Sequence, residues 1–237
     1  MSDKPLFDLS ELSFDEFVSF FFDHDIDAEE YWYQDPALSS WNDFDEQSIR
    51  SPRVIVGHMT RLFTNFGDIA SKFSLQQINA GIWAMFTNQP FRLQKHLWLL
   101  STPLPERLDC IHAMYSVFSD YVAKSKVEVM ENCFYMWWDW MAGNFWQQLL
   151  FTDKISEGDV SSLNQEQKTL LDAMLQTLSR TLALSDQRAQ QYALHGLGHL
   201  HHPDVRTIVQ RYLDKHRHEL PLDTVRWVET CRDGTVM

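Results

Sequence analysis

Apolar residues recur at every third or fourth position along most of the chain, and this spacing limits what the chain can fold into. In residues 75–86, for example, Leu75, Ile78 and Ile82 lie on one side of a helix. Regular alternation of apolar and polar residues, which indicates strands, is missing, and only the short run RVIVGHM at 53–59 is ambiguous. Eight glycines and eight prolines in 237 residues also favour long helices. We therefore predict an all-α fold, an irregular multi-helix bundle.

Several helix boundaries are marked by residues that cap or begin helices. Ser13 and Glu16 have the spacing of a capping box, Pro105 lies in a first helical turn, and Ser185 precedes another helix as its N-cap. The predicted helices that follow the capping box cover 52–66, 75–86, 104–123, 127–151, 165–183, 186–202, 204–217 and 222–231.

The chain is long enough for one large domain, and its parts differ in composition. We expect a single α-helical domain over residues 1–237. Its parts are an acidic, aromatic-rich segment (1–50), an aromatic helical body (51–155) and C-terminal helices (164–231). The polar stretch SEGDVSSLN separates the last two parts.

The sequence predicts a protein of a reducing compartment that does not span a membrane. The start, MSDKPLFDLSEL, lacks the basic and apolar segments of a secretory signal. The most apolar stretch, 134–151, contains Asp139 near its middle, so we expect no membrane span. Three widely separated cysteines, Cys110, Cys133 and Cys231, show neither metal-ligand nor redox spacing. We expect a cytoplasmic protein.

Negative charge is concentrated in the first part of the chain. The chain has 33 acidic and 20 basic residues, a net charge of −13. Residues 1–50 hold 14 Asp or Glu against Lys4 and Arg50 alone, a net charge of −12. Direct binding of nucleic acid is disfavoured by this balance, because it needs cationic groups that neutralise phosphates.

The acidic segment is also rich in aromatic residues, unlike tails that only keep a protein soluble. Acidic surfaces speed association with basic proteins, and Trp and Tyr are common interface anchors. We therefore expect a basic protein partner here; the alternative is that the aromatic residues belong to the core and the carboxylates are ordinary surface. The predicted partner-binding residues are Asp23, Asp25, Asp27, Glu29, Glu30, Trp32, Trp41, Asp43, Asp45 and Glu46.

Asp23, Asp25 and Asp27 alternate as they do in a calcium-binding loop. The sixth position of such a loop needs Gly for a sharp turn, and the twelfth needs a bidentate Glu. Ala28 and Gln34 occupy these positions, so we predict no calcium site.

Four histidines crowd the stretch ALHGLGHLHHPDVR at 193–206. On a helical projection His195, His199 and His202 share one face, opposite leucines that we expect to be buried. Histidines one and two turns apart can bind one zinc ion, which makes these three candidate metal ligands. The zinc-protease pattern needs Glu after the first histidine, where this chain has Gly196. We favour a solvated polar face, with no metal and no cofactor.

Asp139 lies among tryptophans in the stretch MWWDWM. Such a carboxyl group can act as an acid, face a wet groove, or accept a hydrogen bond from an indole N–H. No histidine or glutamate stands at a useful spacing along the chain, so we favour a structural role.

The segment RAQQYALHGLGHLHHPDVRTIVQRYL, residues 188–213, resembles a HEAT-like repeat. The stretch ALHGLG at 193–198 matches the small-residue and leucine pattern that ends the first helix of such a repeat, and Pro203 and Asp204 open the second helix. The resemblance implies a pair of antiparallel helices and, usually, protein recognition.

Two classes of function follow. The favoured one is a non-catalytic protein-binding module that engages a basic partner through the acidic, aromatic segment. By analogy of size and charge, bacterial immunity proteins, which cover the positive active site of a toxin, belong to this class. The alternative is a metal-dependent or acid–base enzyme on a helical scaffold that uses His195, His199 and His202 or Asp139. The sequence contains no phosphate loop, nucleophile elbow or dinucleotide motif.

Overall fold

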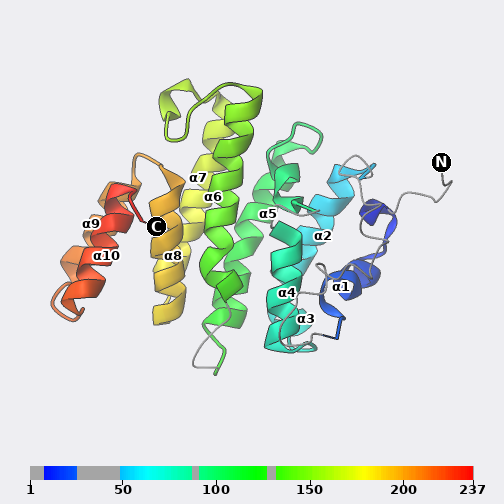
Figure 1. Ribbon diagram of the computed structural model, residues 1–237, viewed down its shortest axis with the longest axis horizontal. Helices are drawn as coiled ribbons and strands as arrows, with labels where there is room; N and C mark the ends of the chain where they lie inside the picture. Colours follow the sequence, from blue (N-terminus) through cyan, green and yellow to red (C-terminus); the bar gives the residue numbers. More distant parts are fainter. Residues whose placement is uncertain (1–7, 26–48, 87–90, 127–131, 237) are drawn as a thin grey trace.

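The chain folds into helices that lie side by side in an elongated array (Figure 1). The computed structural model describes residues 8–25, 49–86, 91–126 and 132–236, and none of these residues is in a strand. The prediction of an all-α fold is therefore confirmed. The array begins with α1 at one end and finishes with α9 and α10 at the other.

The α-helices are α1 (Phe14–Phe22), α2 (Pro52–Thr64), α3 (Phe66–Ala70), α4 (Leu75–Phe86), α5 (Leu104–Ser116), α6 (Asn132–Thr152), α7 (Gln165–Leu182), α8 (Gln187–Leu200), α9 (Val205–His216) and α10 (Leu222–Asp233). Short 3-10 helices are η1 (Leu9–Glu11), η5 (Leu93–Leu97) and η7 (Val160–Ser162), and the π-helix η6 (Val117–Val122) continues α5.

Local sequence signals set several of these boundaries. Ser13 caps α1 through the predicted capping box, and its backbone N–H donates to the Glu16 carboxylate at 2.8 Å. Asp186, one residue after the predicted cap, begins α8 by accepting the Ala189 N–H at 3.0 Å. The same helix ends two residues before its predicted end, because His201 adopts a left-handed φ of 55°.

Three other segments differ from the sequence-based expectation. The ambiguous run 53–59 is helical and belongs to α2. The helix expected over 52–66 is interrupted at Asn65, whose backbone is not helical, so α3 starts as a separate helix. The helix expected over 104–123 changes to π-helical hydrogen bonding in its last part. The first residues of the aromatic helix expected at 127–151 lie outside the described ranges.

Buried apolar side chains form one cluster that extends from Leu9 to Val236. As the sequence indicates, α6 runs through the middle of this cluster, and Trp137, Trp138 and Trp146 on it are almost completely buried. Their indole rings fill the space between α6 and its neighbours on several sides. No described helix, α6 included, has both the length and the apolar character that crossing a lipid bilayer requires.

Helix α8 joins α6 to the last two helices. A Cβ atom at Gly196 would lie 2.4 Å from the Cβ of Trp138, and one at Gly198 would lie 2.4 Å from Cγ1 of Val236. Real Cβ atoms do not approach this closely, so both positions need glycine for the neighbouring segments to come so near. The short turn after α8 lets α9 return antiparallel beside it, as Pro203 predicts (Figure 1).

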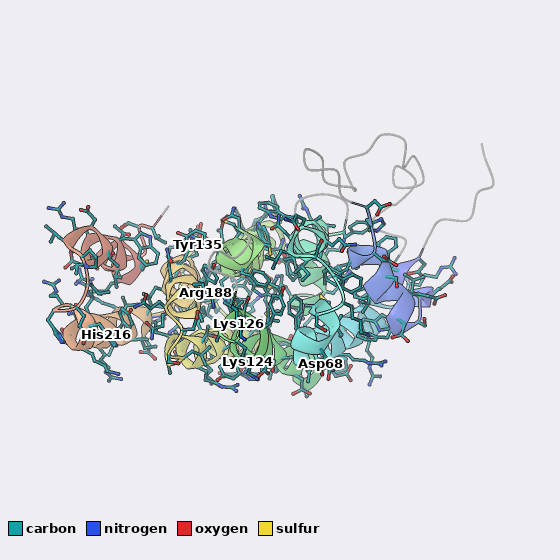
Figure 2. The ribbon with its side chains drawn as sticks, turned by 90° about the horizontal axis from the view of Figure 1, so that it is seen from below. Asp68, Lys124, Lys126, Tyr135, Arg188 and His216 are labelled. Atoms are coloured by element: carbon teal, nitrogen blue, oxygen red, sulfur yellow. The ribbon has the colours of Figure 1, made fainter. Side chains whose placement is uncertain are left out.

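At the start of α8, the side chain of Arg188 binds the end of the π-helical segment by hydrogen bonds. Its Nη2 donates to the carbonyl oxygens of Val122 at 2.9 Å and Ser125 at 3.0 Å. Carbonyl groups at the end of a helix lack N–H partners within that helix, and here the guanidinium supplies donors to them. In the view of Figure 2, Arg188, Lys124 and Lys126 are all labelled near the middle of the long axis of the molecule.

Candidate functional site

His195 does not lie on a solvated face, which corrects the expectation from the sequence. Its side chain is 2 % exposed and its ring stacks on the ring of Tyr135, with centroids 3.9 Å apart. Its Nδ1 lies 3.2 Å from the backbone oxygen of Tyr135 and donates to it. The part of α8 that carries His195 is therefore packed against α6, on which Tyr135 is labelled in Figure 2.

A chain of polar contacts runs from His195 to Asp139. Nε2 of His195 lies 3.2 Å from Nε2 of His199, and Nδ1 of His199 lies 3.7 Å from Oδ1 of Asp139. Because Nδ1 of His195 carries the proton that it donates to Tyr135, its neutral ring accepts at Nε2, and His199 donates there. This partner of Asp139 was not predicted from the sequence, since 60 positions separate the two residues.

The three candidate zinc ligands do not converge. His202 turns away from the other two, and its Nε2 lies 2.9 Å from Oδ1 of Asp172 on α7. Over the described ranges, no group of three or more His, Cys, Asp or Glu side chains is arranged to hold a metal ion. The helix ends at Leu200, so the periodicity that placed His202 on the same face stops before it.

The protonation of His195 follows from its surroundings. Burial and, as the second cause, the neighbouring His199 lower the pKa of His195 to about 4. The ring is therefore neutral at pH 7. Nε2 of His199 is used by His195, and Nδ1 lies nearest to a carboxylate, Asp139, at 3.7 Å. This arrangement suits a structural link between α6 and α8 better than acid–base catalysis.

Asp139 forms part of the wall of a pocket between α4, η5 and α6. Its side chain is 32 % exposed, so of the alternatives raised by the sequence it is the wet groove that the structure shows. Trp83 and Trp140 stand beside it in the wall of this pocket.

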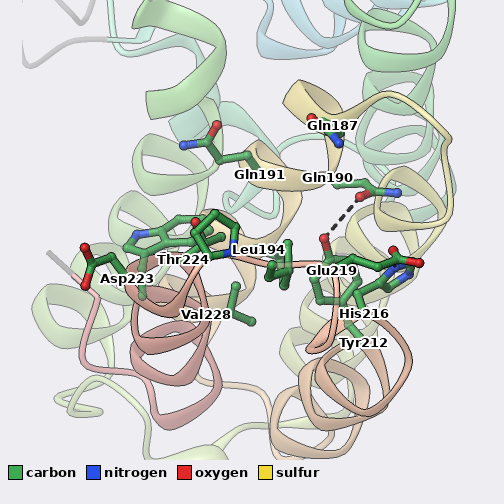
Figure 3. A pocket seen from close by; sticks show the side chains of 13 residues that line it. Gln187, Gln190, Gln191, Leu194, Tyr212, His216, Glu219, Asp223, Thr224 and Val228 are labelled. Atoms are coloured by element: carbon green, nitrogen blue, oxygen red, sulfur yellow. Dashed lines mark hydrogen bonds and ion pairs between the residues drawn. The ribbon is translucent and has the colours of Figure 1, made fainter.

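A groove of about 590 Å³ lies in the C-terminal helices (Figure 3). It lies between the first turns of α8 and α10 and the last turn of α9. Three glutamines of α8, two aromatic side chains and two carboxylates contribute most of its polar groups. The residues that line it are Gln187, Gln190, Gln191, Leu194, Tyr212, His216, Glu219, Leu220, Pro221, Asp223, Thr224, Trp227 and Val228.

One side of the groove is held rigid by hydrogen bonds. The hydroxyl of Tyr212 donates to Oε1 of Gln190 at 3.1 Å (Figure 3), and Nε2 of Gln190 donates to the backbone oxygen of Leu184 at 2.7 Å. The ring of Tyr212 lies 4.7 Å from that of His216, which in turn contacts Glu219 at 3.5 Å. Burial raises the pKa of Tyr212, so its hydroxyl stays protonated and remains a donor.

The other side of the groove is open and polar. Gln187 and Gln191 are exposed, and so are the carboxylates of Glu219 and Asp223. Glutamine side chains donate and accept hydrogen bonds as peptide groups do. No Lys or Arg is among the described residues that line the groove. Asp223 pairs with Arg226 at 3.4 Å, but the wall of the groove itself carries carboxylates and amides, so it suits a polypeptide segment that carries positive charge.

Most of the predicted partner surface lies outside the described residues. This applies to Asp27, Glu29, Glu30, Trp32, Trp41, Asp43, Asp45 and Glu46. Asp23 and Asp25 are described and exposed, and Asp23 is the C-cap of α1.

The groove was not predicted from the sequence. It forms where the ends of three helices diverge, and no motif or spacing signals such a place. Trp227, an aromatic residue that lines it, is only partly buried, and this burial is known from the structure alone.

Searches against protein-family models, curated proteins and solved structures found no match to this chain.

Proposed function

We propose that this protein is a non-catalytic binding module that engages a basic protein partner. The observation that carries the proposal is the C-terminal groove, which combines exposed carboxylates, amide groups and partly buried aromatic rings without a lining Lys or Arg. Interfaces favour this mixture, in which aromatic side chains anchor and polar groups at the rim select the partner.

The charge of the chain supports the same proposal. Nearly all of its excess negative charge falls in residues 1–50, and an acidic protein attracts basic partners over long range. In the proposal, the acidic residues from Asp23 to Glu46 steer the partner, as in immunity proteins that cover a basic toxin. The resemblance of residues 188–213 to a HEAT-like repeat agrees with protein recognition, because the groove is built on that helix pair.

A matched pair of charge reversals tests the proposal. Asp223 and Asp68 are both exposed and both lie in the first turn of a helix, α10 and α3 respectively, but only Asp223 lines the groove. The partner is first isolated by crosslinking in lysate of the source organism and then purified. Association and dissociation rates are then measured at low and high salt by surface-based binding.

We expect Asp223→Lys to slow association about three- to tenfold at low salt, and Asp68→Lys to have a smaller effect. Trp227→Ala should instead speed dissociation, by an amount on the order of 2 kcal/mol in affinity. A purified partner that is not basic, or that binds all three variants at the wild-type rates, would refute the proposal.

A further inference from the structure

The pocket between α4, η5 and α6 differs in chemistry from the groove. It has a volume of about 350 Å³, within the range of small-ligand sites. Aromatic rings and hydrogen-bond acceptors make up most of its wall, and no Lys or Arg is among its described lining residues. These are Trp83, Phe86, Gln94, Asp139, Trp140, Gly143, Asn144 and Gln147.

Three aromatic side chains form a corner in this pocket. The indoles of Trp83 and Trp140 lie with centroids 4.5 Å apart at 70°, so they present two nearly perpendicular faces. Phe86 adds a third ring, 6.0 Å from that of Trp140. The faces of aromatic rings carry negative potential, and tryptophan attracts a cation most strongly.

Gln94 supplies a buried acceptor without a partner. The side chain is 3 % exposed, and its Nε2 donates to the backbone oxygen of Phe86 at 2.7 Å. This bond fixes the orientation of the amide, so the buried Oε1 is the atom that still lacks a donor among the described residues. Within the described chain, Oε1 has no hydrogen-bond partner. A buried carbonyl in this state is costly unless a donor meets it.

Asp139 supplies the negative charge. Its one described contact is through Oδ1, to His199 at 3.7 Å, which is longer than a hydrogen bond. The carboxylate can therefore accept hydrogen bonds from a donor in the pocket. The amide oxygen of Asn144 is already used, because it accepts the indole N–H of Trp98 at 3.0 Å.

We infer that this pocket binds a guanidinium group, the side chain of an arginine presented by a polypeptide. A guanidinium is planar, stacks on an indole, and carries five N–H donors, enough to reach Asp139 and Gln94 together. This inference rests on the proposed function in one respect: the arginine would be carried by the basic partner. The pocket and the C-terminal groove are separate surfaces, so each is tested alone.

Binding of three blocked amino acids tests the inference. The probes are N-acetyl-arginine methylamide, the corresponding lysine compound, and the citrulline compound, which has nearly the shape of arginine without its charge. Titrations are followed by calorimetry and by the indole N–H signals of Trp83 and Trp140, assigned with single Trp→Phe variants. The arginine compound should shift these two signals and bind at least tenfold more tightly than the citrulline compound.

Two variants and one control locate the site. Asp139→Asn keeps the shape of the side chain and should weaken arginine binding at least tenfold. Gly143→Leu should abolish it by filling the pocket, and the helix tolerates the change because a Cβ there meets only Oδ1 of Asp139, at 4.0 Å. Asp172 lies on α7, away from the pocket, and its carboxylate contacts His202. Asp172→Asn should leave binding unchanged.

Absence of arginine binding, equal binding of citrulline, or equal loss in Asp139→Asn and Asp172→Asn would each overturn the inference. Tighter binding of lysine than of arginine would overturn the assignment to a guanidinium. These results are independent of the proposed function: a basic partner that still responds to Asp223→Lys would uphold that function even if the pocket bound no arginine.

Discussion

The aromatic half of the molecule, the described residues from 8 to 152, and the C-terminal half, residues 165–236, fill their cores differently. In the aromatic half, rings meet edge to face: Trp137 lies 5.2 Å from Phe63 and 4.9 Å from Phe86 between centroids. The C-terminal half is packed mainly with Leu, Val, Ala and Gly. Large rings bridge helices that stand apart, whereas small residues let helices approach closely.

The two halves meet where α8 packs on α6 and where α7 packs on α5, and the first of these contacts combines both modes of packing. Gly196 of α8 lies directly against the Cβ of Trp138 on α6. The same contact buries His195 and brings His199 to Asp139. The difference between the halves therefore also explains their sites. Indoles and a carboxylate form a pocket in one half, and diverging helix ends with amide side chains form a groove in the other.

The largest effect should come from a charge in the C-terminal core. Leu197 is fully buried, so Leu197→Asp removes a large apolar contact and buries an unpaired carboxylate. We expect a loss of about 5 kcal/mol or more in the free energy of unfolding. Hydrogen exchange followed by mass spectrometry should show loss of protection in α7 to α10, while α2 and α5 keep theirs.

The matched control is Leu222→Asp. Leu222 is 65 % exposed and begins α10, where a negative charge is favourable. This change should leave protection as in the wild type. If Leu197→Asp instead removes protection from α2 and α5 as well, the two halves unfold as one unit. The difference in packing between them would then not produce a difference in stability.

A smaller effect is expected from a single methyl group at the junction. Gly196→Ala places a Cβ against Trp138 and should lower the free energy of unfolding by about 1–3 kcal/mol. The same substitution at Gly57 in α2, where nothing lies within 4 Å of the new atom, should raise it by about 0.5–1 kcal/mol. Urea denaturation measures both. Equal effects of the two substitutions would show that close packing does not hold the halves together.

The last effect depends on pH and concerns one buried histidine in each half. Burial lowers the pKa of His96 and of His195 to about 4, with Lys95 and His199 as second causes, against an ordinary value of 6.5. Between these two pH values the unfolded chain binds more protons than the folded chain. The free energy of unfolding should therefore fall as pH drops from about 6.5 to 4.

Substitutions separate the two contributions. Neither ring nitrogen of His96 has a hydrogen-bond partner within the described chain. His96→Leu should therefore reduce the acid sensitivity and raise the free energy of unfolding at pH 7 by about 1 kcal/mol. His195→Gln should also reduce the acid sensitivity but lower stability at pH 7, because it removes the stacking on Tyr135. Denaturation curves at several pH values measure this, and unchanged acid sensitivity in both variants would contradict the assignment.

Much of the local structure was determined by the sequence itself. The apolar spacing predicted helices over most of the described chain, and the capping box of Ser13 and the turn at Pro203 formed where predicted. These features depend on atoms within a few residues of each other, since a helix bonds each N–H to a carbonyl four residues earlier. The net charge of residues 1–50 is likewise a property of the sequence alone.

Only the tertiary structure decided which sides of the helices are buried. The periodicity of α8 identified its leucine face, but His195 on the opposite face is buried too, because α6 packs against it. The contact of His199 with Asp139, the pocket beside Trp140 and the groove beside Trp227 each join segments far apart in the chain. Helical periodicity identifies the apolar face of a helix. It does not identify which distant helix will cover a polar residue, because that depends on the packing of the whole core.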